Sequence, residues 1–86
     1  SKVMEVLPQA LVNAKVPNHK KESYMEYAEI AEAIHALEEK FAGEGRVLIR
    51  PSGTEPLVRV MIEGKDQQII DAEARKLANL ITNVML

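Results

Sequence analysis

The sequence predicts an α+β fold, a two-layer sandwich of two helices on an antiparallel sheet, with the element order β-α-β-β-α. Three observations predict it: apolar residues alternate with polar ones in three segments, they recur at helical spacing in two others, and Pro- or Gly-containing stretches separate these segments. The alternating segments are 9–16, 46–50 and 57–63, and the helical segments are 24–42 and 67–85. The chain has 86 residues, so we expect residues 1–86 to form one domain.

The first predicted strand covers residues 9–16. Its apolar side chains share one face, which we expect to be buried, and they are Ala10, Val12, Ala14 and Val16. Pro17 and the polar residues after it break the alternation, which indicates a loop. We expect His19, Lys20 and Lys21 to lie in this loop as a solvated basic group.

The first predicted helix covers residues 24–42. Ser23 is a typical N-cap residue, and Glu26 three positions later completes the pattern of a capping box. Gly43 is a plausible stop at the C-terminal end. One apolar stripe follows the helical period, and its members are Tyr27, Ile30, Ala31, Ile34, Leu37 and Phe41.

A β-hairpin and a second helix complete the predicted sandwich. The hairpin strands are 46–50 and 57–63, with the loop 51–56 between them. Asp66 is expected to cap the helix 67–85. The inner stripe of this helix consists of Ile70, Ala74, Leu77, Ile81 and Val84.

Composition excludes several classes of function. Aromatic residues make up 3% of the chain, and the net charge is −2, so a nucleic-acid-binding surface is not expected. The chain contains no Cys, which excludes disulfides and thiolate metal sites. No apolar run reaches the roughly 20 residues that a membrane span needs, so neither a membrane nor a nucleic acid is an expected partner, and a cytoplasmic location is expected.

The loop between the hairpin strands carries the chemistry. Within five positions it offers the permanently charged guanidinium of Arg50, the hydroxyl groups of Ser52 and Thr54, and the flexible Gly53. A glycine that adopts a positive φ allows successive N–H groups to converge on an anion. These residue types together predict a phosphate-binding loop.

Strand register brings Arg59 toward the same loop. The apolar residues of both hairpin strands must share the core face, which places Arg50, Leu57 and Arg59 on the opposite face. If Arg50 lies across from Leu57, Arg59 is its diagonal neighbour at about 7–8 Å. Two guanidinium groups beside one hydroxyl-rich loop repel each other unless an anion lies between them.

A purely structural interpretation of this segment is also open. Ser-Gly-Thr between two strands is ordinary turn chemistry, and an arginine at a strand end is often simply solvated. The loop matches neither the dinucleotide-binding glycine pattern nor the Walker pattern, and no helix follows it directly.

Residues 45–64, Gly-Arg-Val-Leu-Ile-Arg-Pro-Ser-Gly-Thr-Glu-Pro-Leu-Val-Arg-Val-Met-Ile-Glu-Gly, closely resemble the phosphate-binding loop of the α-D-phosphohexomutases. Within that superfamily the segment is most similar to the bacterial phosphoglucosamine mutases. The resemblance extends over nearly the whole chain and implies the fourth, C-terminal domain of such an enzyme. It implies no catalytic residue and no metal ligand in this domain. The implied substrate phosphate contacts are Arg50, Ser52, Gly53 and Thr54, with Arg59 as an auxiliary contact and Pro51, Glu55 and Pro56 ordering the loop.

The resemblance also implies what the whole enzyme does. A phosphoserine in the first domain donates its phosphoryl group to glucosamine 6-phosphate, and the bisphosphate intermediate turns around to leave glucosamine 1-phosphate. The implied partners are these phosphosugars and the other three domains, with Mg²⁺ as the cofactor in the second domain. The fragment lacks the phosphoserine segment and the metal loop, so we expect it to be inactive alone. The alternatives are the same domain of a phosphomannomutase or phosphoglucomutase, and a free-standing anion-binding or protein-interaction module.

Overall fold

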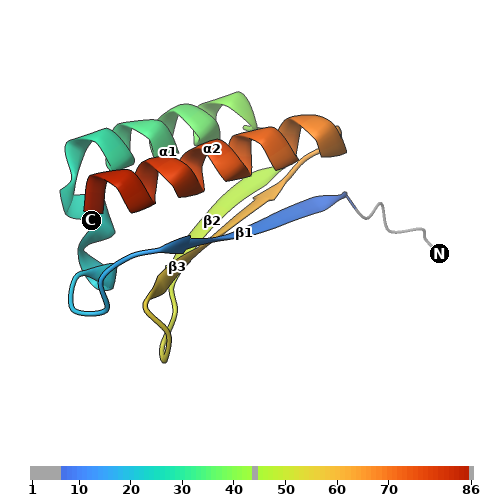
Figure 1. Cartoon of the computed structure of the whole chain (residues 1–86). Helices are drawn as coiled ribbons and strands as arrows, with labels where there is room; N and C mark the ends of the chain where they lie inside the picture. The colour runs from blue at the N-terminus through green and yellow to red at the C-terminus, as the bar shows by residue number, and fades with distance from the viewer. Residues whose placement is uncertain (1–6, 44, 86) are drawn as a thin grey trace.

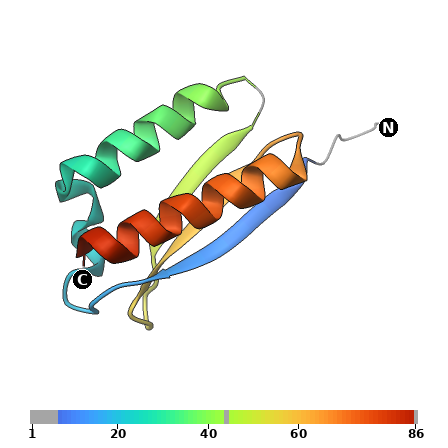
Figure 2. The ribbon, with the colours of Figure 1, turned by 45° about the horizontal axis from the view of Figure 1, so that its top comes forward.

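Two α-helices lie side by side on one face of a three-stranded antiparallel sheet, as Figures 1 and 2 show for the computed structural model of the chain. The structure describes residues 7–43 and 45–85. Its elements are β1 (Gln9–Lys15), the 3₁₀ helix η1 (Lys21–Glu26), α1 (Ala28–Lys40), β2 (Arg46–Pro51), β3 (Leu57–Glu63) and α2 (Gln67–Met85). The predicted fold class and element order are confirmed, with η1 as an additional short element.

The sheet has the strand order β1-β3-β2, so β3 lies in the centre and pairs with both neighbours. Val60 of β3 lies opposite Val12 of β1 and Ile49 of β2. The preceding residue of β3, Arg59, lies opposite Asn13 of β1 and Arg50 of β2. Because side chains alternate along a strand, the first row faces the helices and the second lies on the other face. Among the described residues no helix covers that second face (Figure 1).

The core lies between the sheet and the helices, and the predicted faces of all three strands contribute to it. Val58, Val60 and Ile62 of the central strand are completely buried, as are Ile70 and Ile81 of α2. The predicted stripe of α2 is buried except at Val84, which is half-buried against the core, and Ala78 and Met85 extend it. Sustained alternation therefore predicted the buried face of each strand correctly.

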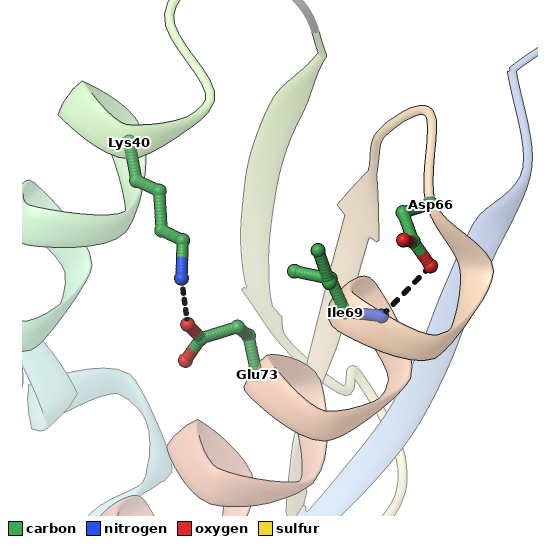
Figure 3. A network of polar contacts seen from close by, with 4 residues as sticks. All are labelled: Lys40, Asp66, Ile69 and Glu73. Carbon is green, nitrogen blue, oxygen red and sulfur yellow. Dashed lines mark hydrogen bonds and ion pairs between the residues drawn. The ribbon is translucent and has the colours of Figure 1, made fainter.

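The N-terminus of α2 is capped as predicted. The Asp66 side-chain Oδ1 accepts hydrogen bonds from the backbone N–H groups of Gln68 (3.0 Å) and Ile69 (3.3 Å), as Figure 3 shows for Ile69. These are two of the N–H groups that a helix start leaves without a partner. In the same view, Lys40 near the end of α1 forms an ion pair with Glu73 of α2 and joins the two helices.

We expect Asp66→Ala to destabilise the domain by about 1 kcal/mol, because it removes the acceptor for both N–H groups. For a domain of this size that corresponds to a melting temperature lower by about 4–8 °C. Thermal unfolding followed by circular dichroism measures the change. Asp66→Asn keeps a capping oxygen and should lose much less, so an equal loss in both variants would contradict the capping role.

The predicted start of the first helix is wrong. Residues 21–26 form a 3₁₀ helix, and Ser23 lies inside it without capping anything: its backbone N–H donates to the Lys20 carbonyl at 2.8 Å. The α-helix starts after Tyr27, which is extended (φ −90°, ψ 117°) and makes no side-chain capping hydrogen bond. The change of helix type follows from tertiary contacts, because Lys21 and Tyr24 both bond to the β2–β3 hairpin. The predicted end is confirmed, since Gly43 has a φ of +80° just after α1.

No helix among the described residues combines the length and the apolar character that crossing a membrane requires.

Candidate anion-binding site

Arg50 and Arg59 lie directly opposite each other at the end of the β2–β3 hairpin. The sequence pattern placed Arg50 across from Leu57 and Arg59 on the diagonal, a register that is wrong by two residues. The actual register follows from the loop, because Ser52 N–H donates to the Leu57 carbonyl at 2.9 Å and lengthens β2 to Pro51. Directly opposed residues have Cβ atoms about 4.5–5.5 Å apart, so the two cationic side chains are closer than predicted.

Neither guanidinium has an ion-pair or hydrogen-bond partner within residues 7–43 and 45–85. Both residues are exposed. Arg46 provides a contrast on the same strand and the same face, because its Nε lies 3.6 Å from the Glu63 carboxylate. Like charges placed opposite each other are unfavourable, and an anion between them removes that repulsion.

Asn13 completes the row on the open face of the sheet, since β1 brings it opposite Arg59 from the other side. Lys15, two residues further along β1, lies opposite Leu57 beside the loop. Sequence reasoning missed both residues as members of the site. Alternation within 9–16 already placed them on the face away from the core, but only the pairing of β1 with β3 shows which residues they adjoin.

Ser52 organises the loop from inside. It is 7% exposed, and its Oγ accepts hydrogen bonds from the backbone N–H groups of Thr54 (3.4 Å) and Glu55 (3.2 Å). This is the local turn chemistry that short hydroxyl side chains favour. The hydroxyl proton remains available for donation, because these two bonds use only the lone pairs of the oxygen.

Gly53 does not adopt the positive φ that the sequence suggested, since Gly43 alone among the described residues does so. A Cβ at Gly53 would meet no atom within 4 Å. Within the described residues its N–H has no acceptor, and the hydroxyl of the exposed Thr54 makes no hydrogen bond. The loop tip thus presents a backbone donor and a hydroxyl to open space.

The other loop residues bond through their main chains. The Pro56 carbonyl accepts from the Val16 N–H at 3.1 Å and ties the loop to β1. The Glu55 carbonyl accepts from the Leu57 N–H at 2.8 Å, while the Glu55 side chain is exposed. Pro51 is the last residue of β2, an edge strand, where a missing N–H is tolerated.

Lys21 lies against this loop and not in solvent, which corrects the expectation of a solvated basic group. It is 7% exposed, and its Nζ donates to the Glu55 carbonyl at 3.2 Å. His19 is exposed and Lys20 partly buried, so only Lys21 of the three is directed inward. No sequence signal separates Lys21 from Lys20, because the distinction depends on contacts with residues more than 30 positions away.

The arrangement suits binding of an anion. It combines two guanidinium groups without a carboxylate partner, a free backbone N–H and two hydroxyl groups. Within the described parts of the chain, no three His, Cys, Asp or Glu residues gather as a possible metal site. The residues present can hold and orient a phosphate group.

One family model and several curated proteins match most of this chain. The family model described as "Phosphoglucomutase/phosphomannomutase, C-terminal domain" matches residues 11–80. A phosphoglucosamine mutase of Clostridium botulinum (strain Alaska E43 / Type E3) is 67% identical over 79 residues, and one of Ruminiclostridium cellulolyticum is 61% identical over 79 residues. Each alignment covers 92% of this chain and 18% of the relative, so the chain spans less than a fifth of the length of these relatives.

Solved structures show the same fold. An N-acetylphosphoglucosamine mutase of Aspergillus fumigatus, in complex with GlcNAc-6P and magnesium, superposes with a TM-score of 0.71 and 25% identity. A variant of that enzyme in complex with glucose 1,6-bisphosphate superposes with a TM-score of 0.74 and 27% identity. These alignments cover 93% and 92% of this chain and 16% of each solved chain.

Proposed function

The chain belongs to the family of phosphoglucomutase/phosphomannomutase C-terminal domains, and from this membership we propose that it holds one phosphate group of a hexose phosphate. The parent enzyme is a phosphoglucosamine mutase, which interconverts glucosamine 6-phosphate and glucosamine 1-phosphate. The 67% identity to a phosphoglucosamine mutase favours this branch over a phosphomannomutase or phosphoglucomutase parent. The family match over residues 11–80 likewise argues against a free-standing anion-binding module.

The observation that carries the proposal is the opposed pair Arg50 and Arg59, for which the described residues provide no carboxylate partner. A phosphate dianion between them removes the repulsion and accepts hydrogen bonds from both guanidinium groups. The Gly53 N–H and the hydroxyl groups of Ser52 and Thr54 complete the set of donors. Pro51, Glu55 and Pro56 order the loop, the last two through their carbonyl groups.

In the proposed reaction a phosphoserine elsewhere in the parent transfers its phosphoryl group to a hydroxyl of the phosphosugar. The P–O bond to serine breaks and a P–O bond to the sugar forms, while the sugar hydroxyl loses its proton and the serine oxygen gains one, which gives a bisphosphate and free serine. The bisphosphate then turns around and returns its other phosphoryl group to the serine. The reaction therefore needs a second position that accepts either phosphate without reacting with it.

This domain suits that second position. Its donors position the phosphate and stabilise its charge, and they contribute no nucleophile. Ser52 is buried and committed to the loop turn, so it is not the phosphoserine. We place the phosphoserine, the sugar-recognition loop and the Mg²⁺ site in the other three domains of the parent enzyme. We expect the parent enzyme to be cytoplasmic. The present chain alone is expected to lack mutase activity.

Titration of glucosamine 6-phosphate into the chain tests the site directly. We expect backbone amide NMR shifts at Arg50, at residues 52–55 and at Arg59, with an affinity of about 1 mM, because the enclosing domains are absent. Sulfate should produce shifts at the same residues, whereas glucosamine, which has no phosphate group, should produce none. Shifts confined to α1 or α2 would refute the assignment.

A further inference from the structure

We infer that η1 is a clamp that sets the shape of the anion loop from both of its ends, with Lys21 and Tyr24 as positioning residues. The inference rests on the proposed function, because it explains how that site is kept ready for phosphate. The clamp joins segments that are far apart in the sequence: Lys21 bonds to a residue 34 positions away, and Tyr24 to one 25 positions away.

The first contact holds the C-terminal side of the loop. Lys21 Nζ donates to the Glu55 carbonyl at 3.2 Å. The Glu55 N–H donates to Ser52 Oγ, so this one peptide segment is tied both to η1 and to the serine at the centre of the turn. A shift of Lys21 therefore moves the N–H groups at the loop tip together with it.

The second contact holds the N-terminal side. The Tyr24 hydroxyl donates to the Ile49 carbonyl at 3.0 Å. Ile49 directly precedes Arg50 on β2, which is an edge strand and has a pairing partner on one side only. Tyr24 thus supplies a donor at that edge and fixes the backbone from which the Arg50 side chain projects.

Burial of Lys21 argues for a role beyond packing. A lysine that is 7% exposed loses most of its hydration, and within the described residues no carboxylate forms an ion pair with it. An apolar side chain would fill the same space without that desolvation cost. The ammonium contacts the loop at the Glu55 carbonyl, so its positive charge adds to the attraction of the loop for a phosphate.

The two contacts together keep the loop in its binding conformation before phosphate arrives. A loop fixed at both ends loses less conformational entropy on binding, which raises affinity without any new contact to the ligand. The 3₁₀ geometry of η1 follows from the same requirement, because Lys21 and Tyr24 are three residues apart and a 3₁₀ turn aligns such residues on one side.

The test uses the 86-residue chain with inorganic phosphate as the probe, and it compares Lys21→Met, Lys21→Arg and Tyr24→Phe with the wild type. Lys76→Met is the matched control, since it removes an exposed positive charge from α2. Two measurements are made on each variant: hydrogen exchange of the Ser52, Thr54 and Glu55 amides without ligand, and the dissociation constant for phosphate from amide shifts.

We expect Lys21→Met and Tyr24→Phe to speed loop exchange by about three- to tenfold and to weaken phosphate binding by a similar factor, with exchange in α2 unchanged. Lys21→Arg should bind phosphate nearly as tightly as the wild type. Lys76→Met should match the wild type in both loop exchange and phosphate affinity. Unchanged loop exchange in both clamp variants, or equal acceleration in α2 and the loop, would overturn the inference. If wild-type chain fails to bind phosphate, the proposed function fails, while the exchange data still decide whether the clamp exists.

Discussion

Arg50→Ala is expected to weaken binding of glucosamine 6-phosphate by about 10- to 150-fold, the range that corresponds to losing a charged hydrogen bond of roughly 1.5–3 kcal/mol. The effect is large because Arg50 offers a planar fork of donors, and no neighbouring described residue neutralises its charge. Amide NMR titration measures the loss in this chain. In the full parent enzyme we expect a drop of the same order in kcat/KM, because the contact persists in the transition state.

Arg46→Ala provides a matched control for this prediction. Arg46 lies on the same strand and the same face, but it pairs with Glu63 and lies at the far end of the hairpin from the loop. Its removal deletes the same charge without touching the proposed site, so affinity should change by less than about twofold. If Arg46→Ala and Arg50→Ala lost equal affinity, the effect would come from the overall charge of the chain, and the site assignment would be contradicted. Arg50→Ala should also melt within a few degrees of the wild type, since the side chain is exposed.

Gly45→Ala is expected to destabilise the domain by about 3 kcal/mol, equivalent to a melting temperature lower by about 12–24 °C. A Cβ at this position would lie 1.9 Å from the backbone oxygen of Glu63, on the central strand. The clash is with backbone, so no side-chain rotation relieves it. The start of β2 must move away from β3, and thermal or urea unfolding measures the resulting loss.

Gly53→Ala is the matched control, because a Cβ there meets nothing within 4 Å and its φ is not positive. Its melting temperature should stay within about 2 °C of the wild type. Its phosphate affinity should fall, since the added methyl group occupies the open space in front of the loop donors. If both variants lost a similar amount of melting temperature, the clash with Glu63 would not explain the loss in Gly45→Ala. If Gly53→Ala bound phosphate as tightly as the wild type, Gly53 would not belong to the site.

Much of the fold could be predicted because its elements carry strong periodicity. The alternation in 9–16 and the stripe in 67–85 are long enough to determine which face is buried, and Asp66 marked the start of α2 correctly. The start of the first helix could not be predicted in the same way. Ser23 and Glu26 satisfy a local capping pattern, but the contacts of Lys21 and Tyr24 with the hairpin favour a 3₁₀ turn there instead.

The residues of the candidate site were also visible in the sequence, whereas their arrangement was not. The motif from Arg50 to Pro56 and the alternation that includes Arg59 predict which side chains belong to the candidate site. The direct opposition of Arg50 and Arg59 depends on the Ser52–Leu57 hydrogen bond that closes the loop. The register differs from the expected one by two residues, and a shift of two residues keeps every side chain on its own face, so hydrophobic patterning cannot distinguish the two registers.

The fold class and the buried faces could be predicted from the sequence, because each depends on residue types at short, regular spacings, and the family was indicated by the resemblance of residues 45–64 to a known motif. Only the folded structure shows that Lys21 is buried against the loop, that Tyr24 bonds to the edge strand β2, and that Asn13 shares a row with the two arginines. This difference comes from the range of the interactions. Periodicity and capping act over a few residues, whereas these contacts join segments 25 or more positions apart and exist only after the sheet and η1 have packed together.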